Sequence, residues 1–295
     1  MRPVPLKEIA TKTQTQRKTF LFPSVSVANK IRLTARVEKK EEEMNTIDLT
    51  GKVALVTGGS RGLGKAIAMA MAEKGAEVVI CGRKQDNLDQ AVEDLRQKGI
   101  NITAFMANIG NSNEVTALFK AIEDRFERLD ILVNNVGMNI LTPSVIATDE
   151  GLWDKIITTN LKGTFLTSAG GARLMKKAGQ GKIINISSIA ARKAAMGMGI
   201  YCVAKAGVEM LTRVLAVELA QDHINVNGVA PSVVKTKFSQ PFWSNESLLK
   251  EITNTIPMAR IAETDDVVGT VLFLASGMSD FVTGEIITVD GGSMA

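Results

Sequence analysis

The chain has 295 residues, of which 45% are hydrophobic and 22% charged, with a formal net charge of +4, one histidine and two cysteines. It contains no Cys and His residues at zinc-binding spacing, no apolar run near the roughly 18 residues of a membrane span, and no basic patch interleaved with aromatic residues. We therefore expect no metal site, no membrane span and no nucleic-acid partner.

The first 43 residues differ in composition from the rest of the chain. They carry ten Lys or Arg and five Glu, so the remaining residues have a net charge of −1. Residues 1–37 contain one acidic residue among many basic ones and several threonines, as organelle transit peptides do. A second interpretation rests on the run from Lys39 to Met44. Purine codons can encode all of it, so it is also typical of a translated ribosome-binding site before a start at Met44.

These two interpretations lead to different compartments. We predict that residues 1–43 are a basic extension, either a disordered tail or an artefact of start-site choice, and that residues 44–295 form one domain. A bacterial protein that starts at Met44 is expected in the cytoplasm, and a protein with a transit peptide in an organelle matrix. Two cysteines without an evident partner agree with a reducing compartment in either case.

From Lys52 onward, short apolar runs alternate with helical segments. The first run, 52–57, is rich in β-branched residues and ends at two glycines, as buried parallel strands do. Further strands are predicted at 77–81, 102–106, 130–134, 182–186, 225–230 and 285–289, and helices at 65–74, 85–98, 113–126, 150–177, 200–220 and 265–276. This alternation predicts an α/β fold, a single Rossmann-type doubly wound parallel sheet of about seven strands with helices on both faces.

A glycine-rich turn follows the first predicted strand. Gly58, Gly62 and Gly64 have the spacing G-x-x-x-G-x-G, and a helix-forming segment follows directly. A glycine turn between a strand and a helix presents backbone N–H groups and a helix N-terminus to a pyrophosphate. The turn therefore predicts a dinucleotide-binding site.

The only tyrosine, Tyr201, lies thirteen residues after Ser188 and four residues before Lys205. Residues four apart on a helix share a face. The positive charge of Lys205 is therefore expected to lower the pKa of the phenol, which is about 10 when unperturbed. Such a tyrosine suits general acid–base catalysis at neutral pH.

Taken together, these motifs resemble the short-chain dehydrogenase/reductase family over roughly residues 49–292. The motifs stand in the family's order: Thr57–Gly64, Asn134–Gly137, Asn160, Ser188, Tyr201 with Lys205, Pro231 to Thr236, and Val282–Glu285. The resemblance implies an oxidoreductase that interconverts a carbonyl compound and its secondary alcohol by hydride transfer to or from a nicotinamide cofactor.

The resemblance also implies a role for each catalytic residue. Tyr201 would exchange a proton with the substrate oxygen, and Lys205 would lower the tyrosine pKa and bind the nicotinamide ribose. Ser188, which the spacing favours over Ser187, would orient the substrate oxygen. Asn160 would hold a water molecule of the proton relay behind the lysine.

The end of the second predicted strand bears on the choice of cofactor. A carboxylate there would bind the adenine ribose 2′-OH, but the sequence continues Cys81-Gly-Arg-Lys84 without an acid. Arg83 and Arg61 can bind a 2′-phosphate through charge-assisted hydrogen bonds. We therefore favour NADP(H) over NAD(H). The expected cofactor contacts are Gly58, Ser60, Arg61, Gly62, Leu63, Gly64, Arg83, Asn108, Asn135, Val136, Gly137, Tyr201, Lys205, Pro231, Val234 and Thr236.

Three positions depart from the family pattern. Asn108 stands where an aspartate usually contacts the adenine, Val136 replaces an alanine and Ser232 replaces a glycine. Val136 and Ser232 are larger than the usual residues and would crowd the cofactor. We expect both to be tolerated, because neither is a catalytic group.

Aromatic residues and methionines gather where the family places its substrate. Residues 238–243 follow the sixth predicted strand, at the position of the family's mobile lid, and hold three of the chain's thirteen aromatic residues. The expected substrate pocket is made of Met138, Ile140, Ser188, Met196, Phe238, Phe242 and Trp243. Such a pocket suits a hydrophobic or acyl carbonyl compound. Segment 235–243 is similar to the branch of carbonyl reductases and sugar-acid or alcohol dehydrogenases, although its aromatic residues have a second interpretation as lid-to-core packing.

Three functions remain open at this point. The first is NADP(H)-dependent carbonyl reductase or alcohol dehydrogenase, and the second is 3-oxoacyl-[acyl-carrier-protein] reductase, for which Lys235 and Lys237 are the only basic residues that stand out near the site. The third is a non-catalytic NADP-binding regulator or partner subunit, against which the complete catalytic set argues.

The resemblance also implies a homo-oligomer, a tetramer or dimer, built through segments 150–177 and 200–220.

Overall fold

Seven parallel strands form one sheet in the order β3-β2-β1-β4-β5-β6-β7 in the computed structural model, which describes residues 47–295. The predicted extension 1–43 lies outside the described residues. The strands are β1 (Val53–Thr57), β2 (Glu77–Gly82), β3 (Ile102–Met106), β4 (Ile131–Asn134), β5 (Gly181–Ile186), β6 (Ile224–Pro231) and β7 (Ile286–Val289). The predicted doubly wound α/β fold is confirmed.

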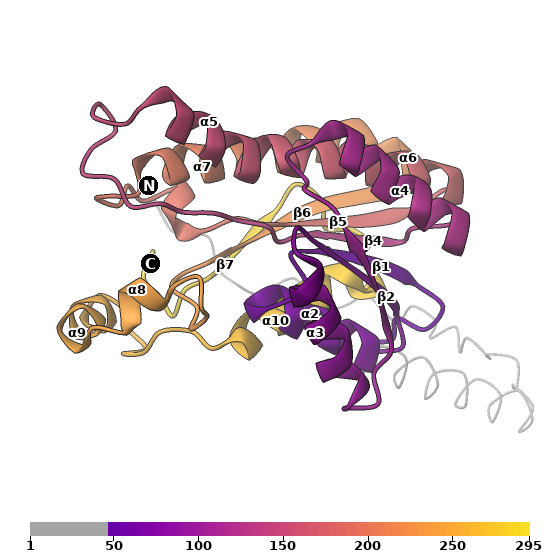
Figure 1. Ribbon diagram of the computed structural model, residues 1–295, viewed down its shortest axis with the longest axis horizontal. Helices are drawn as coiled ribbons and strands as arrows, with labels where there is room; N and C mark the ends of the chain where they lie inside the picture. Colours follow the sequence, from indigo (N-terminus) through magenta and orange to yellow (C-terminus); the bar gives the residue numbers. More distant parts are fainter. Residues whose placement is uncertain (1–46) are drawn as a thin grey trace, which may run out of the picture. The chain divides into compact units, whose positions relative to one another are not determined.

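Helices cover both faces of the sheet (Figure 1). One face carries α2 (Gly62–Glu73), α3 (Gln85–Arg96) and α10 (Thr264–Ala275). The other carries α4 (Ser112–Phe126), α6 (Gly163–Ala178) and α7 (Gly199–Leu219), with α5 (Glu150–Ile157) beside α7. Among residues 47–295, no helix is both long enough and apolar enough to cross a membrane.

The strands are apolar on both sides because each side meets a helix layer. In β1, Ala54 and Val56 pack in the core under α2 and α10, whereas Val53 and Leu55 pack in the core under α4 and α6. Successive side chains of a strand point to opposite faces, so a fully covered strand reads as a continuous apolar run. This is why the strands could be located from sequence within one or two residues.

The chain order reverses between β1 and β4, which lie side by side at the middle of the sheet. From this point the chain winds outward to β3 on one side and to β7 on the other. The loops after β1 and β4 therefore diverge to opposite faces, and such a switch point leaves a crevice at the carboxyl ends of the strands. The crevice lies where the glycine turn follows β1.

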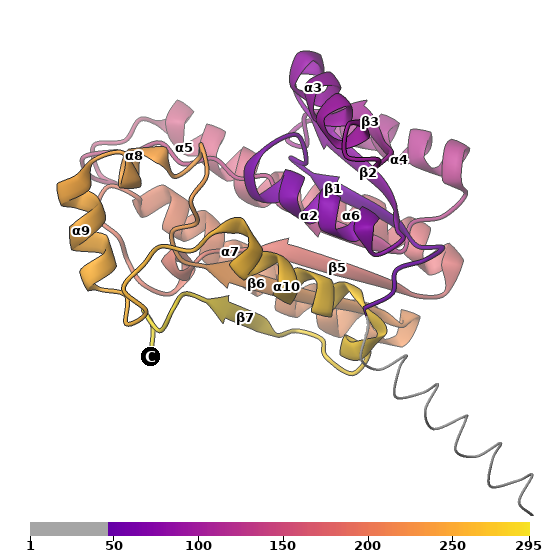
Figure 2. The same ribbon diagram turned by 90° about the horizontal axis from the view of Figure 1, so that it is seen from below.

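Two parts of the structure differ from the prediction. The single helix expected at 150–177 is divided into α5 and α6 by a π-helical turn, η1 (Thr158–Lys162), in which the Asn160 side chain donates to the carbonyl of Ile156. Two further helices follow β6: α8 (Gln240–Trp243) within the predicted lid segment 238–243, and α9 (Glu246–Asn254) directly after it. Figure 2 shows them beyond the carboxyl ends of the strands. They were not predicted because they are short and have no fully buried residue.

Candidate active site

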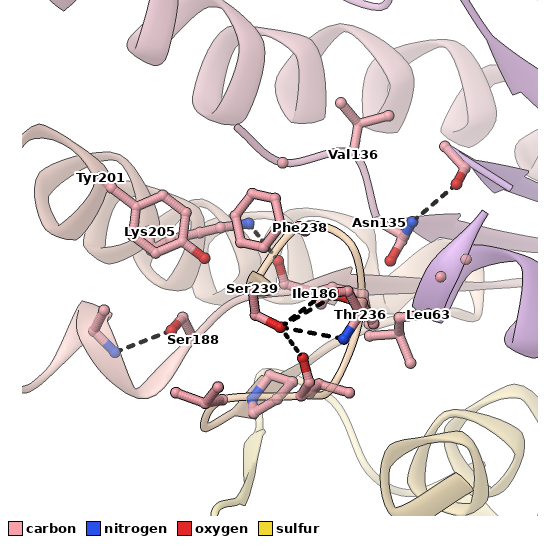
Figure 3. Close-up of a pocket in the computed structure, with 18 of the residues that line it drawn as sticks. Leu63, Asn135, Val136, Ile186, Ser188, Tyr201, Lys205, Thr236, Phe238 and Ser239 are labelled. Atoms are coloured by element: carbon pink, nitrogen blue, oxygen red, sulfur yellow. Dashed lines mark hydrogen bonds between the residues drawn. The ribbon is translucent and has the colours of Figure 1, made fainter. Parts of the chain in front are cut away.

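A cavity of about 750 Å³ lies at the carboxyl ends of the central strands. Its wall combines the glycine turn after β1, the ends of β2 and β4, the segment after β5, the start of α7 and the lid segment after β6 (Figure 3). Every residue predicted to contact the cofactor lies on this wall, as do the predicted catalytic residues Ser188, Tyr201 and Lys205. The structure thus brings together residues as far apart in the chain as Gly58 and Thr236, because parallel strands end at one edge of the sheet.

The glycine turn fits a dinucleotide pyrophosphate. Gly58 and Gly62 have positive φ angles of 65° and 53°, which other residues rarely adopt. A Cβ atom at Gly64 would overlap the Asn135 side chain and the carbonyl of Gly58. Helix α2 begins at Gly62 without a side-chain cap and without an acidic residue in its first turn, so its first N–H groups remain available to an anion.

Asn135 fixes the glycine turn to the next strand. Its Nδ2 donates to the carbonyl of Thr57 over 3.0 Å, and its backbone N–H donates to Thr57 Oγ1 over 3.0 Å. The Thr57 hydroxyl in turn donates to the carbonyl of Val133. These bonds tie the ends of β1 and β4 together beneath the cavity, so Asn135 and Val136 line it at a fixed position (Figure 3).

Basic residues line the cavity wall. Among residues 47–295, no aspartate or glutamate lines it, whereas six Lys and Arg side chains do: Arg61, Arg83, Lys84, Lys193, Lys205 and Lys237. No carboxylate of residues 47–295 lies within 4.0 Å of any of these six cations. The wall therefore favours anionic ligands. The same residues hold no group of three His, Cys, Asp or Glu side chains that could bind a metal ion.

Tyr201 and Lys205 are both buried on the first turns of α7. Lys205 Nζ donates to the carbonyl of Ile186, at the end of β5, over 2.7 Å, and it lies 5.7 Å from the centroid of the Tyr201 ring. Figure 3 shows the Tyr201 hydroxyl turned toward the Ser188 side chain. The helix spacing thus brings the phenol and the ammonium group to the same cavity, as predicted from the sequence.

The pKa values of these two groups differ from the expectation. Burial raises the pKa of Tyr201 to about 12, although its hydrogen bond with Ser188 lowers it in part. Burial also lowers the pKa of Lys205 to about 8. The predicted lowering of the tyrosine pKa by Lys205 is wrong for this structure, because burial of the phenol outweighs the hydrogen bond that lowers its pKa, and the ammonium group bonds to Ile186 rather than to the phenol. At neutral pH the phenol is therefore protonated and can donate a proton.

The two neighbouring serines point in different directions. Ser188 accepts a hydrogen bond from the backbone N–H of Ala190 over 3.2 Å and lies beside Tyr201. Ser187 is buried, and its hydroxyl donates to Glu209 Oε1 over 3.3 Å. Ser188 is therefore the serine whose hydroxyl is available to a substrate oxygen.

Asn160 is fully buried within the π-helical turn and does not reach the cavity wall. Its Nδ2 donates to the carbonyls of Ile156 over 2.8 Å and of Met138 over 2.9 Å, and its Oδ1 accepts from the Met138 N–H over 3.0 Å. The amide thus holds the segment after β4 to α5 directly. The role in a water relay stays a prediction.

The comparisons with known proteins agree with this geometry. Residues 58–294 match a family model described as enoyl-(acyl carrier protein) reductase. The protein "dehydrogenase/reductase SDR family member 4" of Caenorhabditis elegans is 39% identical over 249 residues, which cover 83% of this chain and 96% of the relative. The chain belongs to the short-chain dehydrogenase/reductase family.

Two further relatives support the assignment. The human protein "dehydrogenase/reductase SDR family member 4" is 36% identical over 245 residues, 83% of this chain and 88% of the relative. A solved gluconate 5-dehydrogenase from Burkholderia cenocepacia J2315, in complex with NADP and tartrate, superposes with a TM-score of 0.80 at 32% identity and covers 84% of this chain and 96% of that one. As a short-chain dehydrogenase/reductase, the chain is an NAD(P)-dependent enzyme that acts on CH–OH groups.

On the substrate side of this short-chain dehydrogenase/reductase, the lid contributes Phe238 and Phe242 to the cavity wall. The rings of Phe238 and Tyr201 lie 6.3 Å apart. Four predicted pocket residues do not line the cavity: Met138, Ile140, Met196 and Trp243.

Each of these four residues has another position. Met138 packs against the buried cluster of Ile156, Ile200 and Ala204, and Ile140 and Met196 are exposed. The Trp243 indole N–H donates to the carbonyl of Thr236 over 3.2 Å and to Ser239 Oγ over 3.1 Å. Trp243 therefore holds the turn that carries Thr236.

Other residues of the cavity were missed from the sequence. Lys84 and Asn87 also line the cavity. They could have been predicted from the sequence, because they follow Arg83 directly after the second strand. Lys193 had a similar signal, because it lies between Ser188 and Tyr201 in the chain. Ile252, Ile256 and Ser293 had none, because only the folding of α9 and the C-terminal segment over the strand ends brings them to the cavity.

Proposed function

We propose that this short-chain dehydrogenase/reductase uses NADP(H) to interconvert an anionic carbonyl compound and its secondary alcohol. The observation that carries the proposal is the cavity wall, to which the described part of the chain contributes six basic side chains and no acidic one. A wall of this kind favours a cofactor and a substrate that both bring negative charge.

The adenine end of the cavity supports the choice of NADP(H). Arg83 and Lys84 follow β2, and Arg61 precedes α2, so three cations stand where a carboxylate would exclude a 2′-phosphate. A guanidinium group binds a phosphate through paired, charge-assisted hydrogen bonds. NADP is also the cofactor of the solved gluconate 5-dehydrogenase complex.

The substrate end supports an anionic carbonyl compound. Lys193 lies on the cavity wall in the segment that joins Ser188 to Tyr201, and Lys237 lies next to Phe238 of the lid. A carboxylate on the substrate would neutralise this charge, while Phe242 and Met198 offer apolar contacts. The solved gluconate 5-dehydrogenase complex contains tartrate, a dicarboxylate.

The nicotinamide ring, when bound, supplies or accepts the hydride at the carbonyl carbon. In the reducing direction, the Tyr201 hydroxyl donates its proton to the substrate oxygen, and in the oxidising direction the phenolate takes a proton back. The Ser188 hydroxyl hydrogen-bonds the same oxygen and orients it. Lys205, held by the carbonyl of Ile186 over 2.7 Å, would hydrogen-bond the nicotinamide ribose.

Reduction of 3-oxoacyl thioesters on an acyl carrier protein is the second candidate. The description of the matching family model favours it, because that model is named for a reaction on the acyl carrier protein. An acidic carrier would need a basic surface at the cavity mouth. Two lysines, Lys235 and Lys237, were expected there. Lys235 pairs with Glu263 over 3.3 Å, so Lys237 is the one of the two that remains to contact a carrier. We therefore rank this candidate below a free anionic substrate.

Steady-state kinetics with paired substrates tests both parts of the proposal. We expect NADPH to give a kcat/KM at least about tenfold above NADH, and a 2-oxo acid to be preferred over its neutral methyl ester. Lys193→Gln should raise KM for the oxo acid about tenfold, because the loss of one charge-assisted hydrogen bond weakens binding by about that factor. It should not change KM for the ester. Lys84→Gln is the matched control at the adenine end, and it should raise KM for NADPH instead. Equal use of the acid and the ester by the wild type would contradict the anionic substrate.

An exposed apolar stripe on α7 leads us to propose that the enzyme is a homo-oligomer. Val203, Met210, Val214 and Val217 lie on one face of the helix and are exposed, and Phe165 of the neighbouring α6 is exposed as well. A second copy of the chain would cover this face. Sedimentation velocity should give a dimer or tetramer, and Met210→Glu combined with Val217→Glu should shift it toward the monomer. A wild-type monomer at all concentrations would contradict the proposal.

A further inference from the structure

A buried carboxylate lies directly behind the catalytic groups. Glu209 follows Lys205 by four residues and Tyr201 by eight on α7, so all three occupy neighbouring positions along one side of the helix. Glu209 is only 4% exposed and does not line the cavity. Its carboxylate therefore has no contact with a substrate or cofactor in the mechanism described above.

The partners of this carboxylate come from the segment that carries Ser188. Glu209 Oε2 accepts from Arg192 Nε over 2.9 Å, and Oε1 accepts from the Ser187 hydroxyl over 3.3 Å. Arg213, one turn further along α7, approaches Oε2 at 3.5 Å. Both oxygens of the buried carboxylate are thus paired, as a buried charge requires.

Arg192 extends the same network to the last strand. Its NH1 donates to Thr288 Oγ1 over 3.0 Å, and its NH2 donates to the carbonyl of Ile286 over 3.3 Å. The guanidinium group thus donates to α7 on one side and to β7 on the other. A planar guanidinium with fixed donors holds its partners in one geometry better than a flexible ammonium group does.

The residues held by this network surround Ser188 in the chain. Ser187 precedes it, and Arg192 follows it after the 3-10 turn η2 (Ile189–Ala191). Lys205 holds Ile186 on the same side of the segment. The segment is therefore attached to α7 both before and after Ser188, and α7 is the helix that carries Tyr201.

We propose that Glu209 and Arg192 are positioning residues, which hold Ser188 at the place where its hydroxyl and that of Tyr201 meet one substrate oxygen. This inference rests on the proposed roles of Ser188 and Tyr201. Burying a charged pair contributes little net stability compared with apolar residues of the same size, so a fixed geometry is what the pair supplies. A small displacement of a reacting group is enough to slow an enzyme substantially.

The isosteric substitution Glu209→Gln tests the proposal when it is made in both the wild type and a Ser188→Ala background. In the wild type we expect kcat to fall by about tenfold or more, with the Kd for NADPH unchanged. In the Ser188→Ala background the same substitution should cost less than about threefold, because the hydroxyl that the pair positions is already absent. A pair with a merely structural role would cost the same in both backgrounds, and that result would overturn the proposal.

A matched control lies at the opposite end of the sheet. Asp130, just before β4, is also a buried carboxylate, and it pairs with Arg128 through contacts of 2.8 Å and 2.6 Å and accepts from the Val53 N–H. Asp130→Asn should lower the melting temperature but leave kcat close to that of the wild type. An equal loss of kcat in Asp130→Asn and Glu209→Gln would overturn the positioning role.

A second variant keeps the proposal testable if Glu209→Gln does not fold. Ser187→Ala removes one hydrogen bond to the carboxylate and leaves the ion pair in place. It should lower kcat less than Glu209→Gln does, and in the Ser188→Ala background it should likewise cost less than about threefold. A wild type without any turnover would instead count against the proposed function, whereas turnover that depends on Ser188 but not on Glu209 would count against the inference alone.

Discussion

Replacing Tyr201 with phenylalanine is expected to lower kcat by about a thousandfold, the range seen when a general acid is removed. The ring would keep its place against Phe238, since only the hydroxyl is lost. Neither neighbour can replace it as the proton donor, because the Ser188 hydroxyl is too weak an acid to give up its proton and the Lys205 ammonium group is held by the carbonyl of Ile186. The measurement is NADPH oxidation at saturating substrate.

Cofactor binding supplies the control for this variant. The phosphates would be held by the glycine turn and the cations at the other end of the cavity, so the Kd of Tyr201→Phe for NADPH should stay within about threefold of the wild type. The Kd can be measured by quenching of tryptophan fluorescence, as Trp243 lies in the lid. If the variant kept more than about a tenth of the wild-type kcat, Tyr201 would not be the proton donor.

Replacing Asn160 with leucine is expected to damage both stability and activity. The amide makes three hydrogen bonds to the backbone of Ile156 and Met138, and leucine would remove all three. At about 1 kcal/mol or more for each, the free energy of unfolding should fall by about 3 kcal/mol. The loss of the link to Met138 would also displace the segment after β4, and we expect kcat to fall by about a hundredfold. Urea unfolding and steady-state kinetics measure the two effects.

Thr212→Val separates these two effects. Thr212 is fully buried on α7, accepts from Asn185 Nδ2 over 2.8 Å and donates to the carbonyl of Val208 over 2.8 Å, away from the cavity. This variant should lose about 1 kcal/mol of stability and keep its kcat. If Asn160→Leu lost stability but kept full activity, the amide would have a structural role only.

The parts of the molecule that were predicted from the sequence share one property, which is that their signal is local. The strand, glycine turn and helix at 53–73 are contiguous, and Tyr201 and Lys205 are one turn apart on one helix. Parallel strands covered on both faces read as apolar runs, and their carboxyl ends meet at one edge. Local patterns, together with the rule that the carboxyl ends of parallel strands meet at one edge of the sheet, were therefore sufficient to predict that the cofactor residues lie together.

The parts that were not predicted depend on contacts between distant segments. In the π-helical turn, the Asn160 side chain binds the carbonyl of Ile156 and that of Met138, which lies 22 residues away in the chain. The Glu209 network joins α7, the Ser188 segment and β7 through side chains that have no shared sequence pattern. The pKa of Tyr201 was mispredicted for the same reason, because the burial of the phenol and the carbonyl partner of Lys205 are properties of the folded chain.

The lid shows how residue type alone can mislead. Trp243 and Phe242 are adjacent aromatic residues in one segment, yet only Phe242 lines the cavity. In the short helix α8, neighbouring side chains point in different directions, and the indole of Trp243 turns to the backbone of Thr236. Composition predicted an aromatic lid but could not assign each ring to one side of it.

Hydride transfer from NADPH to a carbonyl carbon is tested most directly by following the hydride itself. NADPH that carries deuterium at the reactive C4 position would be incubated with the full chain and a 2-oxo acid, and the product alcohol would be examined by mass spectrometry. We expect deuterium on the carbinol carbon, one equivalent for each NADPH consumed, and none with Tyr201→Phe over the same time. Tight binding of NADPH without transfer to any carbonyl compound, or transfer that is unchanged in Tyr201→Phe, would contradict the proposed hydride transfer with Tyr201 as proton donor.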